Sequence, residues 1–145
     1  MIEPLESLAF SMRASKGVFA LLLGSGVSRP AEIPSGYELM VDLIRKIAAA
    51  RTKDPNGDPF GWYLSEFGKE PLYSDIIGEL YPDPRIRQEA LREYFERDSQ
   101  DPDSKIKAPT DAHRSIAKLV ARGYVRVILT TNFDRLMETA LDQAE

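Results

Sequence analysis

Two short segments carry residue types and spacings that could do chemistry. The first, Gly24-Ser25-Gly26-Val27-Ser28, directly follows the apolar run 18–23. Glycine permits positive φ and close approach of the backbone to a ligand, and the amides of such a turn can converge on a phosphate. The dinucleotide fingerprint G-x-G-x-x-G is not met, because Arg29 stands where the third glycine would be. The segment therefore predicts either a phosphate-binding turn or an ordinary tight turn.

The second segment, Thr130-Thr131-Asn132-Phe133-Asp134, lies at the end of a second apolar run, 125–130. In open parallel sheets, ligands bind outside the carboxyl ends of the strands. The side chain of Asn132 has both a donor and an acceptor and could position a water or a sugar hydroxyl. Asp134 could accept a hydrogen bond from an amide or a ribose hydroxyl. The alternative is that Asn132 or Asp134 simply caps the helix that follows.

The helices and strands predicted around these two segments indicate an α/β protein. The run VFALLL is typical of a parallel strand covered on both faces, and apolar residues at helical spacing dominate most of the remaining chain. The expected order is helix 4–15, strand 18–23, loop 24–35, helix 36–50, two short helices within 61–80, helix 84–97, polar loop 98–109, helix 110–122, strand 125–130 and a closing helix from Phe133.

Two strands make a marginal sheet, because a stable one usually needs at least three. We therefore expect residues 1–145 to be a single, helix-rich domain with a Rossmann-like parallel sheet, and to be the N-terminal part of a longer domain. A helical insert is expected over about 50–109. The alternative is a small helix-rich domain with a two-stranded core.

Composition excludes several kinds of site. The 145 residues carry a net charge of -4, no cysteine and one histidine. Cysteine-ligated zinc, a disulfide scaffold and a multi-histidine metal site are therefore excluded within them. The charge balance argues against nucleic-acid or membrane partners, and no apolar run approaches the ~20 residues of a membrane span. The acidic N-terminus lacks the basic start of a signal peptide, so we expect a cytoplasmic protein.

Taken in order, the two segments resemble the sirtuin family. LLLGSGVSRPAEIPSG resembles the nucleotide-binding loop of sirtuins, which reads Gly-Ala-Gly-x-Ser followed by Gly-Ile-Pro. DAHRSIAKLVARGYVRVILTTNFD resembles the helix and strand that lead to their Thr-Gln-Asn-x-Asp motif. The resemblance spans residues 21–36 and 111–134, and residues 50–108 match no part of the family. It implies NAD as the bound nucleotide.

The resemblance also implies roles for individual residues. Asn132 matches the catalytic asparagine, which lies near the nicotinamide ribose, and Asp134 matches the aspartate that contacts the nicotinamide carboxamide. His113 matches a helix position outside the active site, so a structural or surface role is expected for it. The residues implied to bind NAD are Gly24, Ser25, Gly26 and Ser28 at the pyrophosphate and adjoining ribose, and Ile33 and Pro34 in the flexible cofactor loop.

The departures from the family pattern bear on the reaction. Ser25 replaces alanine, Glu32 replaces the glycine before Ile-Pro, and Thr131 replaces glutamine. Ser35-Gly36-Tyr37 stands where deacylases carry Asp-Phe-Arg. These changes resemble the divergent sirtuin-like domains of bacterial defence proteins, which cleave NAD outright.

We therefore expect an NAD hydrolase, with antiphage defence implied by the resemblance alone. The family's catalytic histidine lies downstream of the Asn-x-Asp motif and would fall beyond residue 145. These residues by themselves are thus expected to hydrolyse NAD poorly. An NAD-dependent protein deacylase and a non-catalytic nucleotide-sensing module are the alternatives. Self-association and a fused C-terminal domain remain open.

Overall fold

The computed structural model describes residues 2–55, 57–96 and 106–144. The chain divides into two compact units, one made of residues 1–33 and 95–145 and the other of residues 34–94. The expected helical insert, about 50–109, overlaps the second unit, which begins earlier, at Pro34. Most of the polar loop expected at 98–109 lies outside the described residues.

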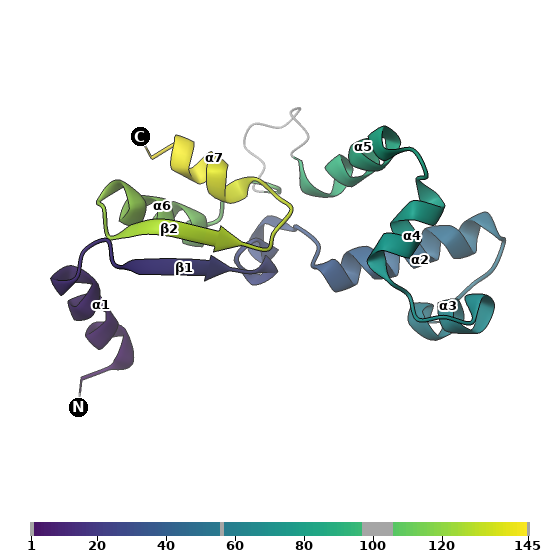
Figure 1. Ribbon diagram of the computed structural model, residues 1–145, viewed down its shortest axis with the longest axis horizontal. Coiled ribbons are helices and arrows are strands. Elements are labelled where there is room, and N and C mark those ends of the chain that lie inside the picture. Colours follow the sequence, from purple (N-terminus) through teal and green to yellow (C-terminus); the bar gives the residue numbers. More distant parts are fainter. Residues whose placement is uncertain (1, 56, 97–105, 145) are drawn as a thin grey trace. The chain divides into compact units, whose positions relative to one another are not determined.

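The first unit holds a two-stranded parallel sheet (Figure 1). Strand β1 (Phe19–Leu23) pairs with β2 (Val125–Thr130), and the register runs from Phe19 opposite Val125 to Leu23 opposite Thr130. The prediction of a helix-rich α/β protein with a parallel sheet is confirmed. The bounds of β2 are those expected from its apolar run.

One face of this sheet is packed. Helices α6 (Asp111–Ala121) and α7 (Leu136–Asp142) contact each other over it. Ala117, Met137 and Ala140 form a buried cluster against which Leu23 and Ile128 of the strands pack. The side chains that alternate to this face of β1 and β2 thus meet the apolar sides of both helices.

The opposite face is open, and the prediction that the first strand is covered on both faces is wrong. Leu22 is 75% exposed, and Val127 and Leu129 on the neighbouring strand are 50% and 59% exposed. A continuous apolar run indicates that both faces of a strand suit burial, but it does not show which face is covered. Within the described residues, α6 and α7 cover one face only.

The first and last helices of the first unit differ in their bounds from the predicted ones. Helix α1 (Pro4–Ala14) is capped by the Glu3–Glu6 pair, and its apolar side chains Leu5 and Phe10 are 80% and 67% exposed. Helix α7 begins three residues later than expected. Phe133 precedes it, 68% exposed, and its ring lies 5.9 Å from that of Phe95.

The second unit is helical. Helix α2 (Gly36–Ala50) has the predicted bounds, and its capping box is present: Ser35 N–H donates to Glu38 Oε2 at 2.8 Å, and Glu38 N–H donates to Ser35 Oγ at 3.3 Å. The predicted short helices are α3 (Pro59–Phe67) and α4 (Tyr73–Leu80), and α5 (Pro84–Phe95) follows. The residues of α2, α3 and α4 that form the buried interior of this unit are Leu39, Leu43, Ile44, Ile47, Ala48, Tyr63, Ile76 and Ile77.

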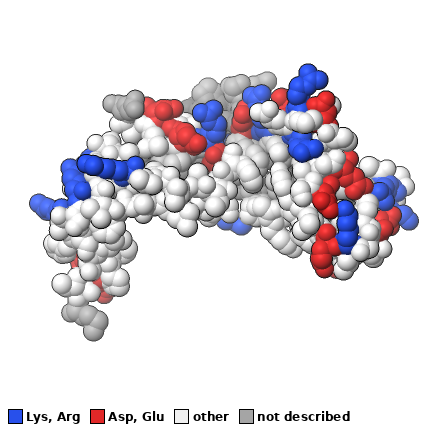
Figure 2. All heavy atoms as spheres, viewed as in Figure 1, with Lys and Arg blue, Asp and Glu red and all other residues white. Residues whose placement is uncertain are grey.

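Charged side chains of both signs are interspersed over the visible face of the second unit (Figure 2). Arg51 directly follows α2. Its Nη1 lies 3.3 Å from Glu66 Oε1 of α3, and its Nη2 lies 3.0 Å from Glu79 Oε1 of α4. These partly exposed pairs contribute little stability individually. No helix in the part of the chain that the structure describes has the length and apolar character needed to cross a membrane.

We predict that Leu43→Ala destabilises the chain by about 2–5 kcal/mol, because it leaves a cavity at a fully buried position of α2. Denaturant unfolding followed by circular dichroism measures the free energy of unfolding. The matched control is Leu64→Ala in α3, where the side chain is 42% exposed. We expect the control to change stability by about 0.5 kcal/mol or less, and equal losses in the two variants would contradict the assignment of this core.

Candidate functional site

The two chemically suggestive segments meet at one edge of the sheet. Leu23 pairs with Thr130 at the carboxyl ends of β1 and β2, and the backbone N–H of Thr131 donates to the carbonyl of Leu23 at 3.1 Å. The turn 24–28 and the segment 131–134 therefore leave the sheet side by side. The prediction that these loops lie together is confirmed.

The side chain of Asn132 joins the two loops. Its Nδ2 donates to the carbonyl oxygen of Gly24 at 3.2 Å and to Ser28 Oγ at 3.3 Å. Ser28 is fully buried, so its hydroxyl is held away from solvent. Asn132 Oδ1 is also buried and has no hydrogen-bond partner among the described residues. The side-chain amide of Asn132 thus links the two loops through Nδ2, while its Oδ1 has no hydrogen-bond partner among the described residues.

The turn itself consists of two short 3₁₀ segments, η1 (Ser25–Val27) and η2 (Arg29–Ala31). Gly24 has φ -117° and ψ 179°, and Gly26 is not among the glycines with positive φ. Neither glycine therefore uses the positive φ that this residue type permits. A Cβ at either position would meet no atom within 4 Å. The space next to both glycines is open, which leaves close approach of a ligand as the remaining role for them.

Asp134 bonds to the first residue of α7. Its Oδ1 accepts a hydrogen bond from the backbone N–H of Leu136 at 3.0 Å, and the residue is 7% exposed. Asp134 thus bonds to the start of α7 without being its N-cap, which is Arg135, and the Asn132 side chain bonds to Gly24 and Ser28 instead. Ile33 is 4% exposed and packs with Ala31 and Leu136 in a buried cluster. Pro34 is the first residue of the second unit.

Thr110 bonds to the turn 24–28, and His113 bonds to Thr110. The sequence did not predict either contact. The hydroxyl of Thr110 donates to the carbonyl oxygen of Val27 at 3.1 Å. The backbone N–H of Thr110 donates to His113 Nδ1 at 3.1 Å. Thr110 was expected as a helix cap and is one. Histidine at the third helical position is not the Glu or Gln of the usual capping box, so its partnership gave no sequence signal.

The protonation state of His113 follows from these contacts. Nδ1 accepts the hydrogen bond from the Thr110 backbone N–H, which places the proton of the neutral ring on Nε2. Thr110 Oγ1 also lies 2.8 Å from Nδ1, so Nδ1 and the Val27 carbonyl are two acceptors for its one proton. The side chain is 1% exposed, and this burial lowers the pKa of His113 below its ordinary value of 6.5, while the carboxylate of Asp134 opposes the shift. Nε2 has no hydrogen-bond partner among the described residues. The structural role expected for His113 is confirmed.

Comparison with known proteins assigns no family to the chain. No protein-family model matches it, and no curated protein sequence matches it. The contacts between the two loops are therefore the basis of the functional proposal.

We predict that the chain loses stability as the pH falls below about 6.5, because the unfolded histidine binds a proton near this value and the buried one binds it more weakly. The unfolded state then holds more protons than the folded state. The stabilisation is complete above the ordinary pKa and declines below it, until the folded ring is protonated as well. His113 is the only histidine, so it is the only side chain whose ordinary pKa lies in this pH range.

The measurement is urea unfolding of the wild type and of His113→Asn at about pH 7.5 and about pH 5.5. Asparagine keeps an acceptor for the Thr110 N–H but does not titrate. We expect the variant to be less stable at the higher pH and to lose less stability on acidification than the wild type. Equal pH dependence in the two proteins would show that His113 is not the titrating group.

Proposed function

We propose that the chain is part of a sirtuin-like domain that binds NAD at the carboxyl edge of β1 and β2 and, in the complete protein, cleaves the bond between nicotinamide and ribose. The observation that carries the proposal is the pair of hydrogen bonds from Asn132 to Gly24 and Ser28. They join two motifs that lie more than 100 residues apart and that the sirtuin resemblance assigns to one nucleotide site.

The residues at this edge suit a dinucleotide. Gly24 and Gly26 are exposed and leave room for a pyrophosphate to approach the backbone. The backbone N–H groups of Ser25 and Gly26 make no hydrogen bond to another described residue, so they are available as donors to an anionic group. The buried Asn132 Oδ1 is an unsatisfied acceptor that a ligand hydroxyl can satisfy.

Asn132 is the residue for which we propose a catalytic role. Its Nδ2 is held by two acceptors, so the orientation of Oδ1 is set before any ligand arrives. An acceptor fixed in this way can orient a ribose hydroxyl or the attacking water without further loss of side-chain entropy. Loss of nicotinamide from NAD would pass through an oxocarbenium-like state, as glycoside cleavage does.

The general base is not found among these contacts. His113 is the only histidine, is 1% exposed, and accepts a hydrogen bond at Nδ1, so it is unsuited to deprotonate a ligand hydroxyl. We therefore propose that these residues bind NAD but turn it over slowly.

The open face of the sheet supports a larger, Rossmann-like sheet. Parallel strands occur almost only in sheets with both faces covered. Leu22, Val127 and Leu129 are apolar and exposed. A longer domain that supplies further strands and covering elements would bury them.

A nucleotide-sensing module without catalysis is the second candidate. It is favoured by the structural use of Asn132, whose donors are already occupied, and by the complete burial of Ser28. In that case, NAD or ADP-ribose would bind to the same edge and remain intact.

We predict that Gly24→Leu abolishes measurable NAD binding while leaving the fold intact, because a Cβ at this position meets no atom within 4 Å and the larger side chain would occupy the space proposed for the pyrophosphate. Isothermal titration calorimetry with NAD and with ADP-ribose gives the affinity, and circular dichroism checks the fold. The matched control is Gly78→Leu in α4, where a Cβ also meets no atom within 4 Å. Unchanged NAD affinity in Gly24→Leu would contradict the proposed site.

Nicotinamide release separates the two candidate functions. In the complete protein, Asn132→Ala should lower the release rate far more than NAD affinity if the chain is catalytic. The unfolding temperature of the Asn132→Ala variant is measured as well, because the substitution removes the two hydrogen bonds that link the loops. Binding of NAD with no nicotinamide release by the complete wild-type protein would favour the sensing module.

A further inference from the structure

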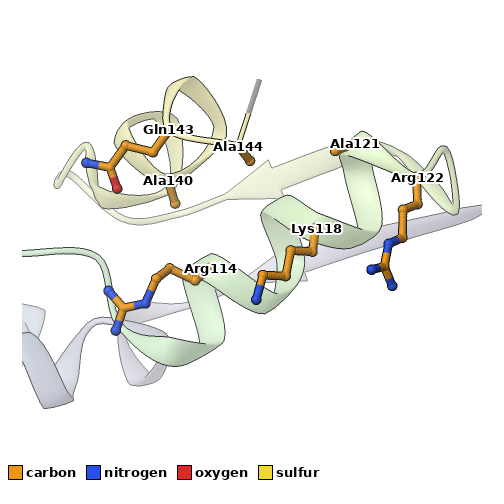
Figure 3. A pocket seen from close by; sticks show the side chains of 7 residues that line it. All are labelled: Arg114, Lys118, Ala121, Arg122, Ala140, Gln143 and Ala144. Atoms are coloured by element: carbon orange, nitrogen blue, oxygen red, sulfur yellow. The ribbon is translucent and has the colours of Figure 1, made fainter.

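A hollow of about 350 Å³ lies between α6 and α7 in the first unit. The residues that line it include none of those assigned to the candidate NAD site. Figure 3 shows Arg114 and Lys118 on α6 and Arg122 directly after it, with Ala140 of α7 and Gln143, which follows α7, on the other side of the hollow. The hollow therefore has one cationic wall and one wall of small and amide side chains.

Of the three cations of this wall, only Arg114 has an ion-pair partner among the described residues. Among the described residues that line the hollow, none is acidic. Arg114 pairs with Asp111 at 2.7 Å. Lys118 and Arg122 have no ion-pair partner in the described part of the chain, although the whole chain has 23 acidic and 19 basic residues. The local excess of positive charge thus arises in a protein that is acidic overall.

This arrangement opposes the stability of α6. Like charges four residues apart on a helix repel each other, and the row 114–118–122 contains two such pairs. The helix dipole favours cations near the C-terminus, which accounts for Arg122 but not for Arg114 in the first turn. A ligand that brings negative charge would relieve the repulsion along the whole row.

The geometry points to a small organic diphosphate as the ligand of this hollow. The backbone positions of successive cations are about 6 Å apart along the helix axis, and their long side chains can converge on the two adjacent phosphates of one diphosphate. Guanidinium groups bind phosphate oxygens with two parallel hydrogen bonds. Ala121, Ala140 and Ala144 add a small apolar surface, and the Gln143 amide offers a donor and an acceptor to the organic part. The volume lies at the lower end of the range for small-molecule sites.

The test uses the 145-residue chain, with ADP as the diphosphate ester and inorganic pyrophosphate as the free anion. We expect ADP to bind and pyrophosphate to bind more weakly, and binding of both to weaken with added salt. Lys118→Ala and Arg122→Gln should each lower the affinity by about tenfold. Both side chains are exposed, so the fold should survive. Arg45→Gln, which removes an exposed cation of α2 in the other unit, is the matched control.

Chemical-shift mapping separates this site from the candidate NAD site, since ADP is also a part of NAD. Shifts at Ala121 and Gln143 that vanish in the α6 variants support the inference, and they do so even if Gly24→Leu has abolished NAD binding. The inference is overturned if neither ligand saturates, if Arg45→Gln weakens binding as much as the α6 variants, or if the shifts are confined to residues 24–28. Stronger binding of pyrophosphate than of ADP would contradict the role given to the alanines and Gln143.

Discussion

The parallel pairing of β1 with β2 is the constraint on which the candidate site depends. It joins segments 108 residues apart, as the hydrogen bond from Asn132 to Gly24 shows, and the entropy lost on closing so long a loop must be recovered by contacts at the ends. The ladder from Phe19–Val125 to Leu23–Thr130 supplies those contacts together with the cluster of Ala117, Met137 and Ala140. Because the strands run in the same direction, both of the loops that follow them leave from one edge.

Buried polar groups then decide the shape of that edge. A buried donor or acceptor is costly unless it is paired, so a polar network that is satisfied allows few alternatives. Ser28 and Thr110 each bond across the loops, to Asn132 and to Val27 respectively. Asn132 Oδ1 and His113 Nε2 are left without described partners, and unsatisfied groups of this kind concentrate where a protein has a task beyond folding.

The surfaces of the first unit show two departures from an ordinary exterior. An apolar face containing Leu22 and Leu129 is open to solvent, whereas parallel sheets normally bury both faces. Among the described residues, those that line the hollow between α6 and α7 include three cations and no carboxylate. Both features cost stability in the isolated chain, the first through hydration of apolar area and the second through charge repulsion. A molecule that covers the apolar face would remove the first cost, and an anionic ligand in the hollow would remove the second.

The sequence by itself determined the local elements and one long-range relation. Capping signals and apolar spacing were sufficient for α2 and β2, whose bounds match the predictions, because these patterns act within a few residues. The meeting of the two loops was also predictable, since parallel strands place their carboxyl ends at one edge. Only the tertiary structure decided which face of the sheet is packed, that Asn132 links the loops while Asp134 bonds to the start of α7, and that Thr110 bonds to the turn. These outcomes depend on partners distant in sequence, and neither residue type nor spacing specifies which of several distant hydrogen-bonding groups a side chain will reach.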